Sequence, residues 1–459
     1  MFDCIRKRRI NFLTRLFLWK EGAYNEFRKS FGANHMRNRK TEIFAIFAVY
    51  FCIHAFNGIT SPFLPLFLED MGYDVTMRGI LLSIGPVVAM LTQPMWGGIG
   101  DRSKNKSRTI WAMAAGMIVV TALYMLSYQK GIRSLLSGLP AMTVTSIFVL
   151  PALILYSFFQ SPMQPMADTV TMEYIYQNRP GFKYGIARVM GTISFTIITY
   201  VTGVVIERSP GGTSTMFPIQ MAVAVFMTLA MLFLPKMPGK QVRQEKTSAV
   251  SLFKDPWFLM ITVMAFVVAT TMGFYVGNFS PYLRGQLHAG EKLIGLSSSV
   301  SALLEIFLFF VTHRIIRKTG ILNLMLIDLL LVAVRWLVFA ITRSIAVIML
   351  MQFLTQPFSW AIFSYTLSVF VQRAIEGKMH SRAQGILNGT ALSFGRVLGT
   401  LGGSFAIKAV GETRQQIVFL GISVMCVVTL AVAVIVFRRL GWKFKKAPDR
   451  FALGENDAI

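Results

Sequence analysis

Residues 161–191 read SPMQPMADTVTMEYIYQNRPGFKYGIARVMG. This stretch places the carboxylate Asp168 at the end of one apolar segment and the guanidinium Arg188 just inside the next, with a short basic loop between them. A charge at the centre of a bilayer costs about 2.5–3.5 kcal/mol on insertion scales, so such charges are rare and often mark a transport pathway. The pair is therefore the first candidate for a site that holds a solute. The alternative is a structural ion pair whose side chains snorkel to the membrane edge.

The composition of the whole chain indicates a membrane protein. Of its 459 residues 54% are hydrophobic and only 15% are charged, whereas soluble domains carry roughly 25% charged residues. The three cysteines lie far apart and the five histidines form no metal-ligand motif, so no metal and no cofactor are predicted. A net charge of +25 would favour a nucleic-acid partner only on a soluble basic domain, but here the basic residues lie between apolar runs.

Apolar segments recur outward from the pair in both directions, each close to the ~20 residues that a helix needs to cross a bilayer. They predict an all-α polytopic membrane protein with twelve transmembrane helices. The expected spans are 43–68, 78–99, 109–128, 143–168, 184–206, 215–235, 257–284, 294–316, 320–342, 345–371, 384–407 and 416–437.

Lysine and arginine concentrate in the tail 1–42, in the connection 236–256 and in the tail 438–459. Because basic residues accumulate on the cytoplasmic side, this asymmetry predicts a multi-pass protein of the cell membrane with both termini in the cytoplasm. The tail 1–42 is predicted to be a basic amphipathic segment on anionic lipid, and a disordered basic tail is the alternative. The net positive charge thus reflects topology, and no nucleic-acid partner is predicted.

The connection 236–256 divides the chain into two predicted six-helix halves, 43–235 and 257–437. Two short similarities support an internal repeat. Asn57 precedes Ser-Pro-Phe-Leu in the first span, and Asn278 precedes Ser-Pro-Tyr-Leu in the seventh. The fifth span contains Arg-Val-Met-Gly-Thr and the eleventh contains Arg-Val-Leu-Gly-Thr. Both similarities join spans six apart, as a duplicated six-helix unit requires.

Further ionisable and polar residues fall inside the predicted spans. We expect the ionisable ones to pair or to line a hydrated interior, because they are costly alone in hydrocarbon. Asp328 and Arg335 share a helix face but are about 10 Å apart along the axis, too far for a direct bond. The candidate substrate-binding or coupling residues are Asp168, Arg188, Glu305, Asp328, Arg335, Arg396, His54, Asn57, Asn278 and Gln352. For His54, Asn57 and Gln352 a polar packing role is the alternative.

A glycine-rich segment, Gly97-Gly98-Ile99-Gly100-Asp101-Arg102, follows the second span. Small residues allow a neighbouring helix to approach closely. We predict a gating turn at the cytoplasmic mouth, in which Gly97, Asp101 and Arg102 help to hold one state closed. An ordinary solvated turn is the alternative.

This turn resembles the signature of the major facilitator superfamily between its second and third helices, although Lys104 replaces the usual glycine. Within the superfamily the chain resembles the group of lactose-type oligosaccharide/proton symporters, phenylpropionate permeases and nucleoside/proton symporters. The residues that carry the resemblance are Pro165-Met166-Ala167-Asp168, Tyr184-Gly185, Arg188, Gly191 and Arg335.

The resemblance implies the major facilitator fold and roles for individual residues. Asp168 and Arg188 match an acidic residue and an arginine of the group and would bind substrate together. Arg335 matches an arginine of the group and would take part in proton coupling. Gln352 and Thr355 stand where the group has its proton-handling histidine and glutamate. If protons drive transport here, Glu305, Asp328 or Asp168 must carry them.

The sequence therefore predicts a monomeric secondary active transporter that moves a small polar or aromatic solute (a sugar, nucleoside or organic acid) by alternating access, with proton-coupled uptake. A membrane sensor that binds ligand without moving it, an efflux antiporter and a uniporter are the alternatives. An enzyme is not predicted, since the sequence contains neither GxSxG nor HExxH.

Overall fold

The computed structural model describes residues 39–129, 141–178, 182, 184–237, 249–375, 379 and 383–443. The predictions for the tail 1–42, for most of the connection 236–256 and for the tail 438–459 fall largely outside these ranges. The domain boundaries expected at 43–235 and 257–437 stay predictions.

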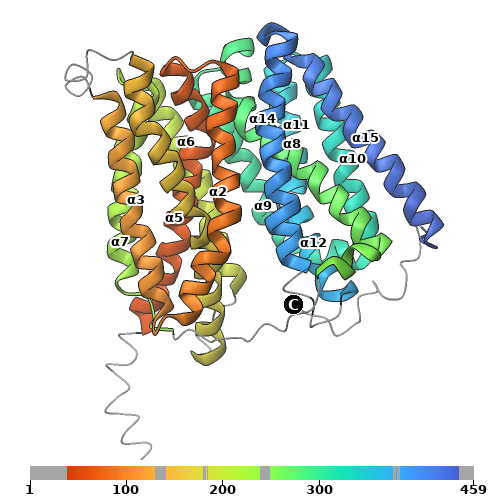
Figure 1. Ribbon diagram of the computed structural model, residues 1–459, viewed down its shortest axis with the longest axis horizontal. Coiled ribbons are helices and arrows are strands. Elements are labelled where there is room, and N and C mark those ends of the chain that lie inside the picture. Colours follow the sequence, from red (N-terminus) through yellow and green to blue (C-terminus); the bar gives the residue numbers. More distant parts are fainter. Residues whose placement is uncertain are drawn as a thin grey trace, which may run out of the picture.

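Long helices joined by short turns make up the described part of the chain (Figure 1). Those before residue 238 are the first helix Arg39–Asp70, α2 Val75–Arg102, α3 Lys106–Tyr128, α5 Ala141–Asn178, α6 Tyr184–Arg208 and α7 Met216–Met231. Those after residue 248 are α8 Pro256–Leu287, α9 Glu291–Thr319, α10 Ile321–Ile341, α11 Ile345–Pro357, α12 Phe363–Ala374, α14 Ser393–Val410 and α15 Gln415–Arg439. Short 3₁₀ turns are η1 Gly212–Thr215, η2 Ala249–Lys254 and η6 Glu412–Arg414, and π-helical turns are η3 Phe358–Ile362 and η5 Gly385–Leu392.

Each predicted span lies on a helical segment, and in the described ranges 9 helices are long and apolar enough to cross a membrane. The other three spans are 294–316 on α9, which carries several charges, and two that π-helical turns interrupt: 345–371 on α11, η3 and α12, and 384–407 on η5 and α14.

Side-chain caps fix where several helices begin. The Asp74 carboxylate accepts a hydrogen bond from the Met77 amide at 2.9 Å at the start of α2, and Asp255 accepts one from the Trp257 amide at the start of α8. These carboxylates satisfy amides that have no partner inside the helix. Both helices thus begin within three residues of the predicted positions.

Two predicted boundaries are wrong. The span expected to end at residue 168 continues as helix to Asn178, so Asp168 lies about three turns before the end of α5. The expected gating turn is also helical, because α2 runs through Gly97 to Arg102. The chain turns only at Ser103–Asn105, where the Asn105 side chain accepts from the Ser107 amide and starts α3.

The helices gather into two bundles that lie side by side in Figure 1. In the N-terminal bundle α3 and α2 pack on α5, and α3 also packs on α7; in the C-terminal bundle α8 packs on α14 and α10 on α15. The first helix and α8, at equivalent positions of the predicted repeat, are each 67% buried over their most apolar window, more than any other candidate span. These two helices therefore form the centres of their bundles.

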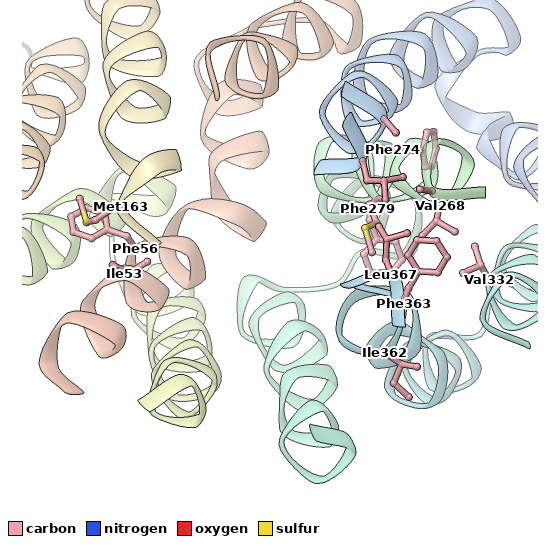
Figure 2. Close-up of a cluster of buried hydrophobic side chains, with 14 of the residues drawn as sticks. Ile53, Phe56, Met163, Val268, Phe274, Phe279, Val332, Ile362, Phe363 and Leu367 are labelled. Carbon is pink, nitrogen blue, oxygen red and sulfur yellow. The ribbon is translucent and has the colours of Figure 1, made fainter. Parts of the chain in front are cut away.

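Buried apolar side chains of both bundles belong to one hydrophobic cluster. Figure 2 shows Ile53, Phe56 and Met163 in its N-terminal part, and Phe274 and Phe363 in its C-terminal part. The bundles meet through two helix pairs, α6 with α9 and α2 with α14. The fold is thus two helix bundles joined along two helix seams.

Gly399 on α14 is where a side chain is least tolerable. A methyl group there would overlap the carbonyl oxygen of Thr270 on α8, because the two backbones touch. We expect Gly399→Ala to destabilise the protein by about 1–3 kcal/mol, measured as a lower thermal unfolding temperature in detergent. Gly421→Ala is the matched control, since a methyl group at Gly421 would meet no atom of another described element within 4 Å. An equal loss in both variants would contradict this packing.

Candidate functional site

Asp168 on α5 and Arg188 on α6 form an ion pair. The Arg188 guanidinium lies 3.4 Å from Oδ2 of Asp168. The other carboxylate oxygen, Oδ1, accepts hydrogen bonds from the Tyr50 hydroxyl at 2.7 Å and from the Gln164 amide at 2.8 Å. Two neutral donors thus fix the orientation of the carboxylate through one oxygen.

The second oxygen of Asp168 is held more loosely. Charge-assisted hydrogen bonds are typically about 2.7–2.9 Å long, so the 3.4 Å contact with Arg188 is a weak one. The side chains of Asp168 and Arg188 are 24% and 35% exposed. A polar ligand group therefore has access to Oδ2 and to the guanidinium at once.

Two polar rows meet at this pair. Along helices, residues three or four apart share a face. The rows are Tyr50, His54 and Asn57 on the first helix, and Gln160, Gln164 and Asp168 on α5. The Gln160 amide donates to the Ile53 carbonyl at 3.0 Å, which holds the two helices face to face.

His54 lies one turn from Tyr50 and packs against α6. Its Nδ1 is 3.1 Å from the Tyr50 carbonyl oxygen and must donate, because a carbonyl only accepts. Gly191 on α6 lies against the imidazole ring: a methyl group there would be 2.5 Å from Nδ1. Gly191 therefore lets α6 come close enough to present Arg188 to Asp168.

Glu305 joins the pair from the other bundle. It lies on α9 and is partly exposed, and its carboxylate interacts electrostatically with Arg188. The seam between α6 and α9 brings these side chains together. Three of the ten candidate residues, Asp168, Arg188 and Glu305, thus converge from both bundles.

The remaining candidates lie elsewhere in the C-terminal bundle. Asn278 is buried and accepts from the Ser404 hydroxyl at 3.1 Å, which ties α8 to α14. The Gln352 amide donates to the Tyr275 hydroxyl at 2.7 Å. The backbone of Arg396 contacts Gly273 on α8. These contacts join helices of one bundle and do not reach Asp168.

Asp328 and Arg335 on α10 are both fully buried and do not pair. Neither carboxylate oxygen of Asp328 has a hydrogen-bond partner among the described residues. Arg335 donates to the Gln356 side-chain oxygen instead. Among the described residues, the expectation that buried charges pair is therefore not met by Asp328 and Arg335.

The predicted gating residues make no network in this structure. Asp101 and Arg102 are exposed, and within the described ranges neither forms a hydrogen bond or an ion pair. A methyl group at Gly97 would meet no atom of another described element within 4 Å. Their role in gating stays a prediction for another conformation.

Ion pairs join the bundles instead at the face opposite residues 39 and 443, at the upper edge of Figure 1. Arg284 at the end of α8 lies 2.8 Å from Glu69 and 2.9 Å from Asp70 at the end of the first helix. Glu69 also pairs with Arg78 on α2 at 3.0 Å. Arg284 is thus the centre of a network that spans both bundles.

Two further contacts complete this network. Lys408 at the end of α14 lies 3.3 Å from Asp74, and the Lys292 amide at the start of α9 donates to Glu207 of α6 at 2.8 Å. The hydrogen bond from the Met77 amide lowers the pKa of the Asp74 carboxyl, so Asp74 stays ionised near neutral pH. We call these residues the opposite-face clamp: Glu69, Asp70, Asp74, Glu207, Arg284, Lys292 and Lys408.

Tyr50 and Gln164 are site residues that the sequence prediction missed. Their signal is the four-residue spacing from His54 and from Asp168, which places each on the same helix face as a candidate. The clamp gave no such signal, because charged residues at the ends of membrane helices are ordinary. Among the described residues, no three His, Cys, Asp or Glu side chains gather as a metal site would require.

Comparison with known proteins identifies the family. The MFS_1-like family matches residues 43–420. The chain belongs to this family. It is therefore a secondary transporter of the major facilitator superfamily, a multi-pass membrane protein that carries a small-molecule solute and is not an enzyme.

Individual relatives agree with this assignment. The maltose permease of Geobacillus stearothermophilus is 24% identical over 87% of this chain and 95% of its own length. The probable 3-phenylpropionic acid transporter of Escherichia coli is 22% identical over 66% of this chain and 76% of its own. A crystal structure of a variant of the nucleoside transporter NupG has a TM-score of 0.73 at 18% identity, covering 86% of this transporter and 99% of that chain. The last likeness confirms the expected fold.

Proposed function

We propose that this transporter takes up a sugar, nucleoside or organic acid across the cell membrane together with protons, through a site built on Asp168, Arg188 and Glu305. The observation that carries the proposal is the convergence of these side chains from both bundles. In a transporter that works by alternating access, the solute site lies between the two bundles, so that either bundle can release it. The names of the relatives supply the range of solutes.

The arrangement around Asp168 suits a hydroxyl-bearing solute. A solute hydroxyl can donate to Oδ2 of Asp168 and accept from the Arg188 guanidinium, replacing the 3.4 Å contact with two short bonds. Tyr50 and Gln164 keep the carboxylate oriented through Oδ1 while this happens. Contact between the bound solute and Glu305 then draws α9 toward the occupied site and favours closure of the bundles.

Proton coupling would use the competition of two carboxylates for one guanidinium. When Glu305 is ionised it attracts Arg188, and when it is protonated Arg188 is left to Asp168 and the solute. Protonation thus changes the attraction between the bundles, which is what coupling requires. We propose Glu305 as the proton carrier on this ground.

The proposal includes topology and assembly. Because basic segments accumulate on the cytoplasmic side, we propose that both termini are cytoplasmic; the clamp would then close the external face, and the solute would leave toward the cytoplasm in this conformation. One chain supplies both bundles and every residue of the site. On this ground we propose a monomer as the working unit.

Transport in proteoliposomes tests the function. Purified protein is reconstituted and tested with labelled maltose, uridine and 3-phenylpropionate, with and without an inward proton gradient. We expect accumulation of one of these only when the outside is acidic. Counterflow without any effect of the gradient would point to a uniporter, and ligand-induced thermal stabilisation without counterflow would point to a sensor.

A further inference from the structure

Arg335 is a buried cation without an anionic partner among the described residues. Its side chain is fully buried on α10, and its Nε and one terminal nitrogen have no hydrogen-bond partner. The other terminal nitrogen donates to Gln356. An arginine keeps its charge under all ordinary conditions, so the positive charge cannot be removed by deprotonation.

Within the ranges that the structure describes, no carboxylate faces Arg335. Asp328 is seven residues away on the same helix, and its oxygens have no hydrogen-bond partner there either. The groups that interact electrostatically with Arg335 are the Tyr275 hydroxyl and the Cys426 thiol, both neutral groups at pH 7. The Trp336 ring contributes a cation–π contact at 5.4 Å, which offsets only part of the cost of burying the charge.

We propose that Arg335 is the centre of an anion-binding site that takes a small monovalent anion. The free Nε–H and terminal N–H groups of a guanidinium match a carboxylate or a halide. The indole N–H of Trp336, beneath the guanidinium, also has no partner in the described part of the chain. Two buried, unsatisfied donor groups and an uncompensated charge thus favour the same kind of ligand.

A route to this site runs along the polar side chains of the C-terminal bundle. Tyr275 interacts electrostatically with both Arg335 and Glu305, and it accepts a hydrogen bond from Gln352. Gln356, which holds Arg335, lies two residues before the π-helical turn η3. Since π-helical turns frequently occur at functional sites, η3 is the place where the anion would enter from the side of Glu305.

The anion has two sources, a free halide and the carboxylate group of a solute. Thermal unfolding of the purified full chain, in chloride-free buffer, is followed while sodium chloride or sodium benzoate is added. We expect a saturable rise in unfolding temperature with at least one of the two salts. Saturation with chloride alone would identify a free ion, and saturation with benzoate alone would identify a carboxylate.

Variants assign the effect to Arg335. Arg335→Gln should abolish the saturable rise and be at least as stable as the wild type without the anion, because a buried uncompensated charge is gone. Arg335→Lys keeps the charge but loses the planar donors, and we expect at least tenfold weaker anion binding. Arg343→Gln, an exposed position two residues beyond the end of α10, is the control and should bind as the wild type does.

Two results would overturn the proposal. One is a saturable rise in unfolding temperature in Arg335→Gln that equals the rise in the wild type. If the glutamine variant fails to fold, the same rise in Arg335→Lys counts in its place. The other concerns Glu305→Gln. If this variant is less stable than the wild type and is the one that binds the added anion, Glu305 is the counter-ion of Arg335 in the wild type. These measurements involve no transport, so their failure leaves the uptake test unaffected.

Discussion

Asp168→Asn and Arg188→Lys should each reduce solute uptake by about 100-fold, while the protein still reaches the membrane in normal amounts. The amide at position 168 keeps the shape but loses the charge that attracts a solute hydroxyl and Arg188. The lysine keeps the charge but loses the planar donors that reach solute and carboxylate together. Hydrogen bonds to charged groups contribute about 1.5–3 kcal/mol each, so losing one or two accounts for a change of this size.

A matched control lies on the same helix. Glu173 on α5 pairs with Lys106 at 3.0 Å, and the Lys106 side chain is only 6% exposed. Glu173→Gln should lower thermal stability but leave the KM and rate of uptake within about twofold, because this pair does not touch the site. Tyr50→Phe removes one of the two donors to Oδ1 of Asp168 and leaves Gln164, so its uptake should fall between that of the site variants and that of Glu173→Gln. Near-normal uptake in both site variants would remove the pair from the mechanism.

The sequence predicts where helices cross the membrane better than where they end. Apolar length marks the bilayer-spanning part, but α5 continues to Asn178 through ten more residues of mixed polar and apolar character. Hydropathy reports depth in the membrane and not the end of the helix. The glycines after residue 96 likewise do not break α2, because glycine lowers helix stability only by about 1 kcal/mol and packing in the bundle exceeds this.

The residues of the candidate site were likewise predictable from the sequence only in part. Asp168 and Arg188 were predictable because one hairpin of adjacent helices brings them together. The approach of Glu305 depends on how α9 packs against α6, which no local pattern encodes. Asp328 and Arg335 show the opposite failure. Each was expected to find a charged partner or a hydrated surface, but α10 buries both, and only the structure shows which side chains face them.

The second large effect is expected at the opposite-face clamp. Arg284 neutralises Glu69 and Asp70 and also lies 3.7 Å from Glu291. Its replacement by glutamine would remove this cation from Asp70 and Glu291, while Glu69 keeps its pair with Arg78, so attraction between the bundles is lost and like charges remain on both sides. An exposed ion pair contributes only about 0.2–1 kcal/mol, but this loss removes several pairs and adds repulsion. We therefore expect Arg284→Gln to shift the population toward a state open on this face by at least tenfold.

A buried reporter measures that shift. Ser404 on α14 is 1% exposed and lies against Gly79 of α2, so a cysteine there reacts with N-ethylmaleimide only when this face opens. In a background without the natural cysteines, Ser404→Cys should be labelled at least ten times faster when Arg284→Gln is added. Salt at 1 M should speed the labelling of Ser404→Cys when the clamp is unaltered, since salt screens exposed charges. Arg414→Gln, an exposed change on the same face, should leave the rate unchanged. Equal labelling with and without Arg284 would mean that helix packing along the α2–α14 and α6–α9 seams, and not the ion pairs, keeps this face closed.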